Sequence, residues 1–149
     1  IVPDAGAHFA WIIILRKRDA FRKAFAKFDP EKVARFGKRD IARLMADAGI
    51  VRARVKIEAT IRGAQLYCDM EERGESFDDF CWSFTSGKVI KSDGRSRIVT
   101  TPLSETISKE MKGRGFKFVG PTIVYAWMQA VGIVNDHSAN CFRRTQVRG

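Results

Sequence analysis

Apolar residues recur along most of the chain three or four positions apart, which is the spacing of amphipathic helices. No stretch of comparable strength alternates apolar and polar residues as a half-buried strand does. Glycines, prolines and capping residues separate the periodic segments, so the fold class is expected to be all-α. The predicted helices cover about 7–17, 20–28, 30–36, 41–46, 54–69, 77–84, 103–112 and 121–131.

Short polar side chains mark where several of these helices begin. Asp29, Pro30 and Glu31 form a helix start, with a capping carboxylate, a proline at the first position and an acid in the first turn. Asp19 and Ser76 are candidate caps of two other helices. These positions predict short helices with defined starting points.

Three further segments carry specific expectations. Residues 7–17 are apolar on nearly every side, so this helix is expected to be buried. Thr85–Pro102 is polar, basic and irregular, and is expected to be an exposed loop. Pro121 suits the first turn of the next helix and Gly132 its end. The apolar positions of that helix are Ile123, Val124, Trp127, Met128 and Val131.

The charge of the chain is strongly positive. Its 149 residues carry 27 Lys and Arg against 17 Asp and Glu, a net charge of +10. This length suits one domain with a single core. The charge favours an anionic partner, of which nucleic acid is the commonest, although basic surfaces also occur on proteins that bind no nucleic acid.

The cysteines and the apolar segments indicate in which cellular compartment the protein is expected. The apolar run Phe9–Leu15 is too short to cross a bilayer, so no membrane association is expected. Cys68, Cys81 and Cys141 are an odd number without a disulfide-like pattern, which favours a reducing cytosol. Cys68 and Cys81 are expected to be buried thiols.

His137 and Cys141 are spaced so that both side chains reach one zinc ion if the segment is helical or turns. Two ligands make half of a structural zinc site. The alternative is a C-terminal cap in which this histidine and cysteine bind no metal.

Several segments of the chain together resemble a known family. They are RGFKFVGPT, the YAWMQAVG helix and the NDH…C ending, preceded by WIIILRKRDAFRKAFAKFDPEKVA, DIARLMADAGIVRARVKIEATIRGA and FDDFCWSF. In order and approximate spacing they are similar to the DNA-3-methyladenine glycosylase I family, which belongs to the helix-hairpin-helix glycosylases. The resemblance runs from Trp11 to about Cys141.

The resemblance implies a helix-hairpin-helix glycosylase-like helical bundle. Residues 1–149 are expected to form one such domain, truncated at the N-terminus relative to the family. The implied activity is base-excision repair, by hydrolysis of the N-glycosidic bond of 3-methyladenine in double-stranded DNA with alkylated bases. A cytoplasmic monomer is expected, associated with the nucleoid if the source is bacterial.

In such a hairpin, the turn and the start of the second helix present backbone N–H groups to a DNA phosphate. Nearby cations strengthen binding through counterion release. The alternative interpretation is an ordinary helical hairpin with a solvated basic edge. The residues expected to contact DNA are Gly49, Ile50, Arg52, Arg54 and Lys56, with Lys117 facing DNA or the base pocket.

The resemblance also assigns residues to a base pocket. Trp11 aligns with the tryptophan that stacks on the flipped base, and Phe9 with an apolar residue placed against the opened DNA stack; core packing is the alternative for both. The family has a glutamate eight residues before the tryptophan, where this chain has Pro3. Asp4 is the candidate substitute, or else a helix cap.

The family's N-terminal segment supplies a cysteine and a histidine to zinc. Without counterparts to these, His137 and Cys141 are expected to form an incomplete site with weak or absent zinc, and no other cofactor is expected.

The missing zinc ligands and the missing glutamate, both differences from the family, leave two rival functions open. One is a DNA-binding helix-hairpin-helix protein with impaired or lost catalysis, and the other is a basic scaffold for a different acidic partner.

Overall fold

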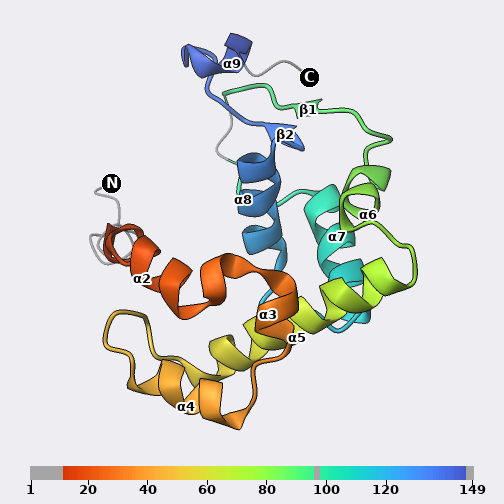
Figure 1. The fold of residues 1–149 in the computed structure, drawn as a ribbon. Helices are drawn as coiled ribbons and strands as arrows, with labels where there is room; N and C mark the ends of the chain where they lie inside the picture. The colour runs from red at the N-terminus through yellow and green to blue at the C-terminus, as the bar shows by residue number, and fades with distance from the viewer. Residues whose placement is uncertain (1–11, 96–97, 147–149) are drawn as a thin grey trace. The chain divides into compact units, whose positions relative to one another are not determined.

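The structure is a computed structural model that describes residues 12–95 and 98–146. The chain divides into two compact units, Ile1–Cys68 and Asp69–Gly149. Helices make up nearly all of its regular structure, as Figure 1 shows. This confirms the all-α fold class. No helix within the described ranges is long and apolar enough to cross a membrane.

The first unit consists of short helices and the start of a long one. The elements are a helical segment at 12–16, α2 (Arg18–Ala24), η1 (Ala26–Phe28), α3 (Pro30–Ala34), α4 (Lys38–Ala46) and α5 (Arg54–Glu72), which continues into the second unit. The core of the unit is formed by buried apolar side chains from these helices and the turns between them, including Phe25, Leu44 and Ile57.

The helix predicted over 20–28 is interrupted. Ala26, Lys27 and Phe28 have positive φ angles of 50°, 61° and 64°, in a region that side-chain-bearing residues rarely adopt. Asp29 is extended, with φ −68° and ψ 113°, because a residue before proline is disfavoured in the helical region. The chain therefore turns sharply between α2 and α3.

Two of the three predicted caps are confirmed. Asp29 Oδ1 accepts a hydrogen bond from the backbone N–H of Lys32 at 3.2 Å, and Ser76 Oγ accepts one from that of Asp79 at 3.3 Å. The cap at Asp19 is wrong, because α2 begins at Arg18, two residues before the predicted start, and Asp19 lies inside its first turn.

The predicted burial of the 7–17 helix is wrong where the structure describes it. Ile12, Ile14 and Leu15 are 38%, 40% and 44% exposed. A helix that is apolar on all sides can press only one side against a single small core, so the remaining side chains stay accessible.

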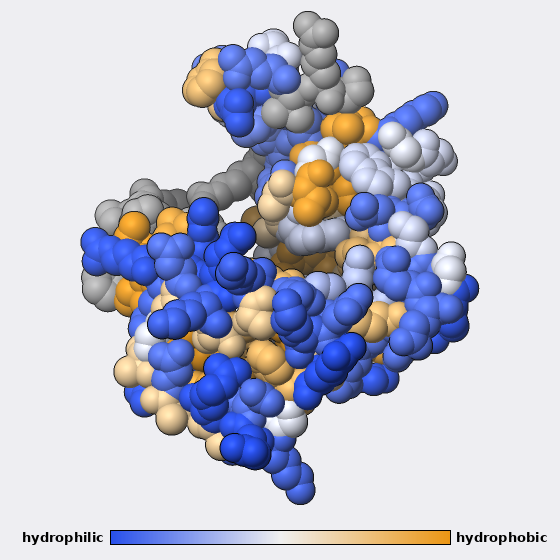
Figure 2. Space-filling model, in the orientation of Figure 1, coloured by the Kyte–Doolittle hydropathy of each residue, from blue (hydrophilic) through white to orange (hydrophobic). Residues whose placement is uncertain are grey.

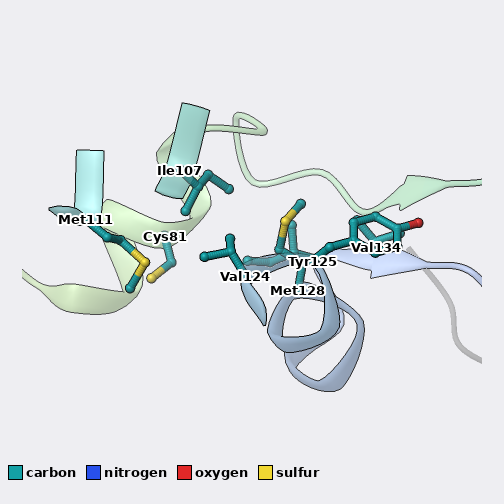
Figure 3. Packing of buried hydrophobic residues seen from close by; sticks show 8 residues of the cluster. Cys81, Ile107, Met111, Val124, Tyr125, Met128 and Val134 are labelled. Carbon is teal, nitrogen blue, oxygen red and sulfur yellow. The ribbon is translucent and has the colours of Figure 1, made fainter. Parts of the chain in front are cut away.

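The second unit surrounds another core. Its elements are α6 (Phe77–Ser83), β1 (Ile90–Lys91), α7 (Pro102–Gly113), α8 (Pro121–Val131), β2 (Val134–Asn135) and α9 (Arg143–Gln146). Figure 3 shows side chains of α6, α7, α8 and β2 packed together, among them Ile107, Val124 and Met128. Ile107 and Met128 are fully buried.

The buried face of α8 differs in part from the expected one. Pro121 and Gly132 begin and end the helix as predicted, Gly132 with a left-handed φ of 85°. Ile123 and Val131 are exposed, whereas Tyr125 is buried. The helix therefore turns a mixed face to the core, because the tyrosine hydroxyl has a polar partner there.

One strand of a short parallel pair, β1, lies in the region predicted to be an irregular loop, and its partner β2 follows α8. Ile90 pairs with Val134 and Lys91 with Asn135, in parallel. Strands of two residues are too short to leave an alternating pattern, which is why the sequence did not indicate them.

The two cysteines predicted to be buried differ in their exposure to solvent. Cys81 is buried as predicted, and this burial raises the pKa of its thiol to about 11. Cys68 is only partly buried, so that part of the prediction is wrong. It lies in the last part of α5, at the end of the first unit.

Candidate nucleic-acid interface

The turn between α4 and α5 is fixed by two side chains. Asp47 Oδ1 accepts a hydrogen bond from the backbone N–H of Gly49 at 2.7 Å. Lys17 Nζ donates to the carbonyl oxygens of Ala48 and Gly49, at 2.9 and 3.1 Å. The polar backbone groups on this side of the turn are thus satisfied within the protein. The hairpin is held in a defined shape and tied to the start of α2.

Close packing favours glycine at position 49. A Cβ atom on Gly49 would lie 2.9 Å from Asp47 Oδ1 and 3.2 Å from the Cβ of Ala20. Either contact forces its neighbour to move. The backbone of the hairpin therefore lies directly against α2, which carries Ala20.

The structure changes the roles expected of two hairpin residues. The Gly49 N–H group already has Asp47 as its acceptor, so it is not an open donor for a phosphate. Ile50 is only 3% exposed and its side chain lies in the core of the first unit. Its backbone N–H already donates to the Asp47 carbonyl oxygen at 3.4 Å, so neither its side chain nor its N–H is open to a DNA phosphate.

Backbone donors remain on the side of the hairpin nearest α5. Within the described residues, the N–H groups of Val51, Arg52, Arg54 and Val55 have no hydrogen-bond acceptor, whereas those of Ile50 and Ala53 do. The first turn of α5 contains no acidic residue to compete for them. Unpaired N–H groups and the positive end of the helix dipole together favour an anion at this place.

Three exposed cations, Arg52, Arg54 and Lys56, accompany these donors. Arg54 Nη1 lies 3.4 Å from Glu58 Oε1, and both side chains are about half exposed. Such a pair is weak, so the arginine can exchange its partner for a phosphate at little cost. Lys117, in the second unit, is also exposed.

The charge is unevenly distributed between the two units. Residues 1–68 contain 15 Lys and Arg against seven Asp and Glu, whereas residues 69–149 contain 12 against ten. The first unit therefore carries +8 of the net charge of +10. This is the unit that contains the hairpin.

His137 and Cys141 lie side by side in the second unit. Cys141 Sγ and His137 Nδ1 are 3.6 Å apart. Zinc bonds of about 2.3 Å to sulfur and 2.1 Å to nitrogen, at a tetrahedral angle, separate the two donor atoms by about 3.6 Å. The pair thus fits one zinc ion, but the described residues include no group of three or more His, Cys, Asp or Glu side chains that would complete a site.

The segment that carries this pair is anchored by the short sheet and by Arg144. The guanidinium of Arg144 donates to the carbonyl oxygens of Ser92 and His137, while the amide of the buried Asn135 donates to the Arg144 carbonyl oxygen at 3.0 Å. Ala139 N–H donates to the Gly94 carbonyl oxygen at 2.9 Å. The histidine and cysteine are therefore positioned by long-range contacts.

A shallow cavity of about 380 Å³ lies beside this segment. The Asp136 carboxylate lines it and accepts hydrogen bonds from Tyr125 Oη at 2.9 Å and Gln129 Nε2 at 3.0 Å. Burial raises the pKa of Tyr125 to about 12, and the hydrogen bond from Tyr125 to Asp136 is the second largest cause of this rise. The other lining residues are Gly94, Arg95, Ile98, Val99 and Ser138.

The base-pocket residues expected from the sequence, Asp4, Phe9 and Trp11, lie outside the described residues. Lys17 and Asp47, which shape the hairpin, were not expected from the sequence. The partners of Lys17 are carbonyl oxygens more than thirty residues away in the sequence, which only folding brings close. The Asp47 bond is local, because an aspartate two residues before a glycine can close a turn onto its own backbone, and that signal was missed.

The fold is that of the helical DNA glycosylases. A solved crystal structure of 3-methyladenine DNA glycosylase I matches it with a TM-score of 0.85 and 45% sequence identity, covering 89% of this chain and 74% of that one. The sequence profile of the methyladenine glycosylase family matches residues 2–144, and the chain belongs to that family.

Two further relatives support this membership. DNA-3-methyladenine glycosylase 1 of Escherichia coli (strain K12) is 49% identical over 138 residues, which cover 91% of this chain and 74% of that protein. A single-substitution variant of 3-methyladenine DNA glycosylase I, solved in complex with 3-methyladenine, matches with a TM-score of 0.83 and 37% identity. That match covers 90% of this chain and 74% of the solved one.

Proposed function

We propose that this chain is a DNA glycosylase that removes 3-methyladenine from alkylated double-stranded DNA during base-excision repair. Membership of the methyladenine glycosylase family carries the proposal, together with a relative solved with 3-methyladenine bound. We also propose that the protein is a monomer and that it is located in the cytoplasm.

The reaction adds water across the N-glycosidic bond. A water oxygen forms a bond to the sugar C1′ atom while the bond from C1′ to the base breaks. The bonding electron pair goes to the base, whose positive charge from methylation is thereby neutralised, and the water loses a proton. Because the base is already a good leaving group, the protein needs chiefly to bind, orient and admit water.

Residues of the hairpin and of the first segment have separate roles in this proposal. Arg52, Arg54, Lys56 and the adjacent N–H groups hold a DNA phosphate independently of sequence. Trp11 stacks on the extruded base and Phe9 fills the gap in the DNA stack. Asp4 is proposed to attract the cationic base where Pro3 replaces the family's glutamate.

Single-turnover release of base from DNA that contains 3-methyladenine tests the proposal. We expect release by the unaltered chain, and loss of release with retained DNA affinity in Trp11→Ala. Arg52→Gln should instead lower affinity several-fold and reduce its salt dependence by about one unit of slope. DNA binding without any released base would leave the DNA-binding protein with lost catalysis as the correct interpretation.

For zinc, we propose weak binding through His137 and Cys141. Their donor atoms lie 3.6 Å apart, as one tetrahedral ion requires, but a structural site takes four protein ligands. Calorimetric titration with Zn²⁺ should give an affinity far below that of structural sites, and His137→Ala should abolish it. Tight binding that survives a chelator would contradict the proposal.

A further inference from the structure

Three cations lie on the exposed part of α2, two of them one turn apart on one side and the third about 100° further around the helix. Arg18, Arg22 and Lys23 are exposed, and none has a carboxylate within ion-pair distance among the described residues. These three residues are termed the α2 cation strip. Figure 2 shows hydrophilic residues interspersed with hydrophobic ones over the part of the surface where Figure 1 places α2.

Two other exposed cations of the same unit have partners within the protein. Lys32 pairs with Asp29 at 2.8 Å. Arg43 pairs with Asp40 at 3.3 Å, donates to the Ala24 carbonyl oxygen and lies over the ring of Phe36. Among the described residues the α2 cation strip has no such partners, and the nearest acid in its sequence is Asp19 on the same helix.

The strip adjoins the hairpin. Lys17, the residue directly before α2, donates to the carbonyl oxygens of Ala48 and Gly49, and Ala20 on α2 packs against Gly49. Arg18 follows Lys17 immediately. Arg22 lies one turn further along the same side of the helix, about 6 Å away along its axis. The spacing spans roughly two phosphates of one DNA strand, which recur every 3.4 Å or so along the duplex axis.

We propose that the α2 cation strip is a second phosphate-binding surface, continuous with the hairpin, that contacts the backbone of the same DNA duplex. The inference rests on the proposed DNA function. Under this inference, some of the cations that give the first unit its charge of +8 contact a second set of DNA phosphates. The duplex is favoured as the occupant because its charge is regularly spaced and because the hairpin beside the strip presents donors suited to phosphate.

The test compares two double substitutions that remove equal charge. Arg18→Gln with Arg22→Gln alters the strip, whereas Lys88→Gln with Lys109→Gln removes two exposed cations of the second unit. Affinity for an undamaged duplex is measured by fluorescence anisotropy across a series of salt concentrations. Loss of two phosphate contacts should lower the slope of log K against log salt by about 1.8 and the affinity by roughly 10- to 100-fold at about 0.1 M salt.

The control variant should bind like the unaltered chain. Equal slopes for the two double variants would overturn the inference. If the strip variant unfolds more readily, Arg18→Lys with Arg22→Lys provides the second comparison, and it should retain the slope. Base release by the unaltered chain is measured separately, so failure of the glycosylase proposal remains distinguishable from failure of the strip.

Discussion

Gly49 shows how one residue can limit the shape of the hairpin. Gly49→Ala should lower the free energy of unfolding by about 1–2 kcal/mol, since the added Cβ meets Asp47 Oδ1 and Ala20 and displaces one of them. Urea unfolding measures the change. Gly113→Ala is the matched control, because that helical glycine has open space around it, and it should be neutral or slightly stabilising. Equal effects of both substitutions would contradict the packing explanation.

Tyr125 makes stability depend on pH in the alkaline range. Its pKa is about 12 in the folded protein, against about 10 in an unfolded chain. Between these values the unfolded state has lost the proton that the folded state keeps, so stability falls as pH rises. Tyr125→Phe should flatten the decline of unfolding free energy from about pH 10 to 12, measured by urea unfolding at each pH.

Cys81 contributes a similar decline at lower pH. Burial raises its pKa to about 11 from an ordinary value of 9.0. Cys81→Ala therefore serves as the comparison, because it should flatten the early part of the decline and leave the part due to Tyr125. A decline that both substitutions leave unchanged would show that other groups cause it.

The link between α2 and the hairpin depends on Lys17. Lys17→Met removes two hydrogen bonds to carbonyl oxygens and should lower the free energy of unfolding by about 1–2 kcal/mol. Hydrogen exchange at the Ile50 amide, which is bonded to the Asp47 carbonyl oxygen, should accelerate as the turn loosens. Lys23→Met removes the same charge from the outer face of α2 and should leave both measurements nearly unchanged.

Several element boundaries could be predicted from the sequence because their causes are local. The start of α3 at Pro30 and the end of α8 at Gly132 depend on residues that cap or terminate a helix within one turn. The break at Ala26–Phe28 and the pairing of Ile90 with Val134 could not be predicted. They depend on packing and on a strand partner more than forty residues away in the sequence.

At the scale of the whole chain, charge should make stability depend on salt. The first unit concentrates +8, so its cations repel one another more in the folded state than in an expanded one. Raising sodium chloride from about 10 to 300 mM should screen this repulsion and raise the Tm. The Arg18→Gln, Arg22→Gln variant should gain less. A Tm that is independent of salt in both proteins would contradict this explanation.

The candidate DNA interface was predictable only in part. Gly49 and its neighbouring cations could be found from the sequence, because a glycine between two helical patterns, followed by basic residues, is visible in one dimension. The buried side chain of Ile50 and the contacts of Lys17 with the turn required the fold, whereas the bond from the Gly49 N–H to Asp47 is local. The backbone N–H groups that remain without an acceptor are therefore those of Val51, Arg52 and the start of α5.

The sequence alone determined the helical class, the caps at Asp29 and Ser76 and the place of the hairpin, because these depend on periodicity and on neighbours within a few residues. The family resemblance was also visible in the sequence, in motifs that follow the family's order and spacing. Tertiary structure decided which groups are available to a partner. Lys17, Asp47 and Ala20 occupy one side of the hairpin, and the cations of α2 lie beside it. Hydrogen bonding and burial depend on distances between segments that only folding brings together.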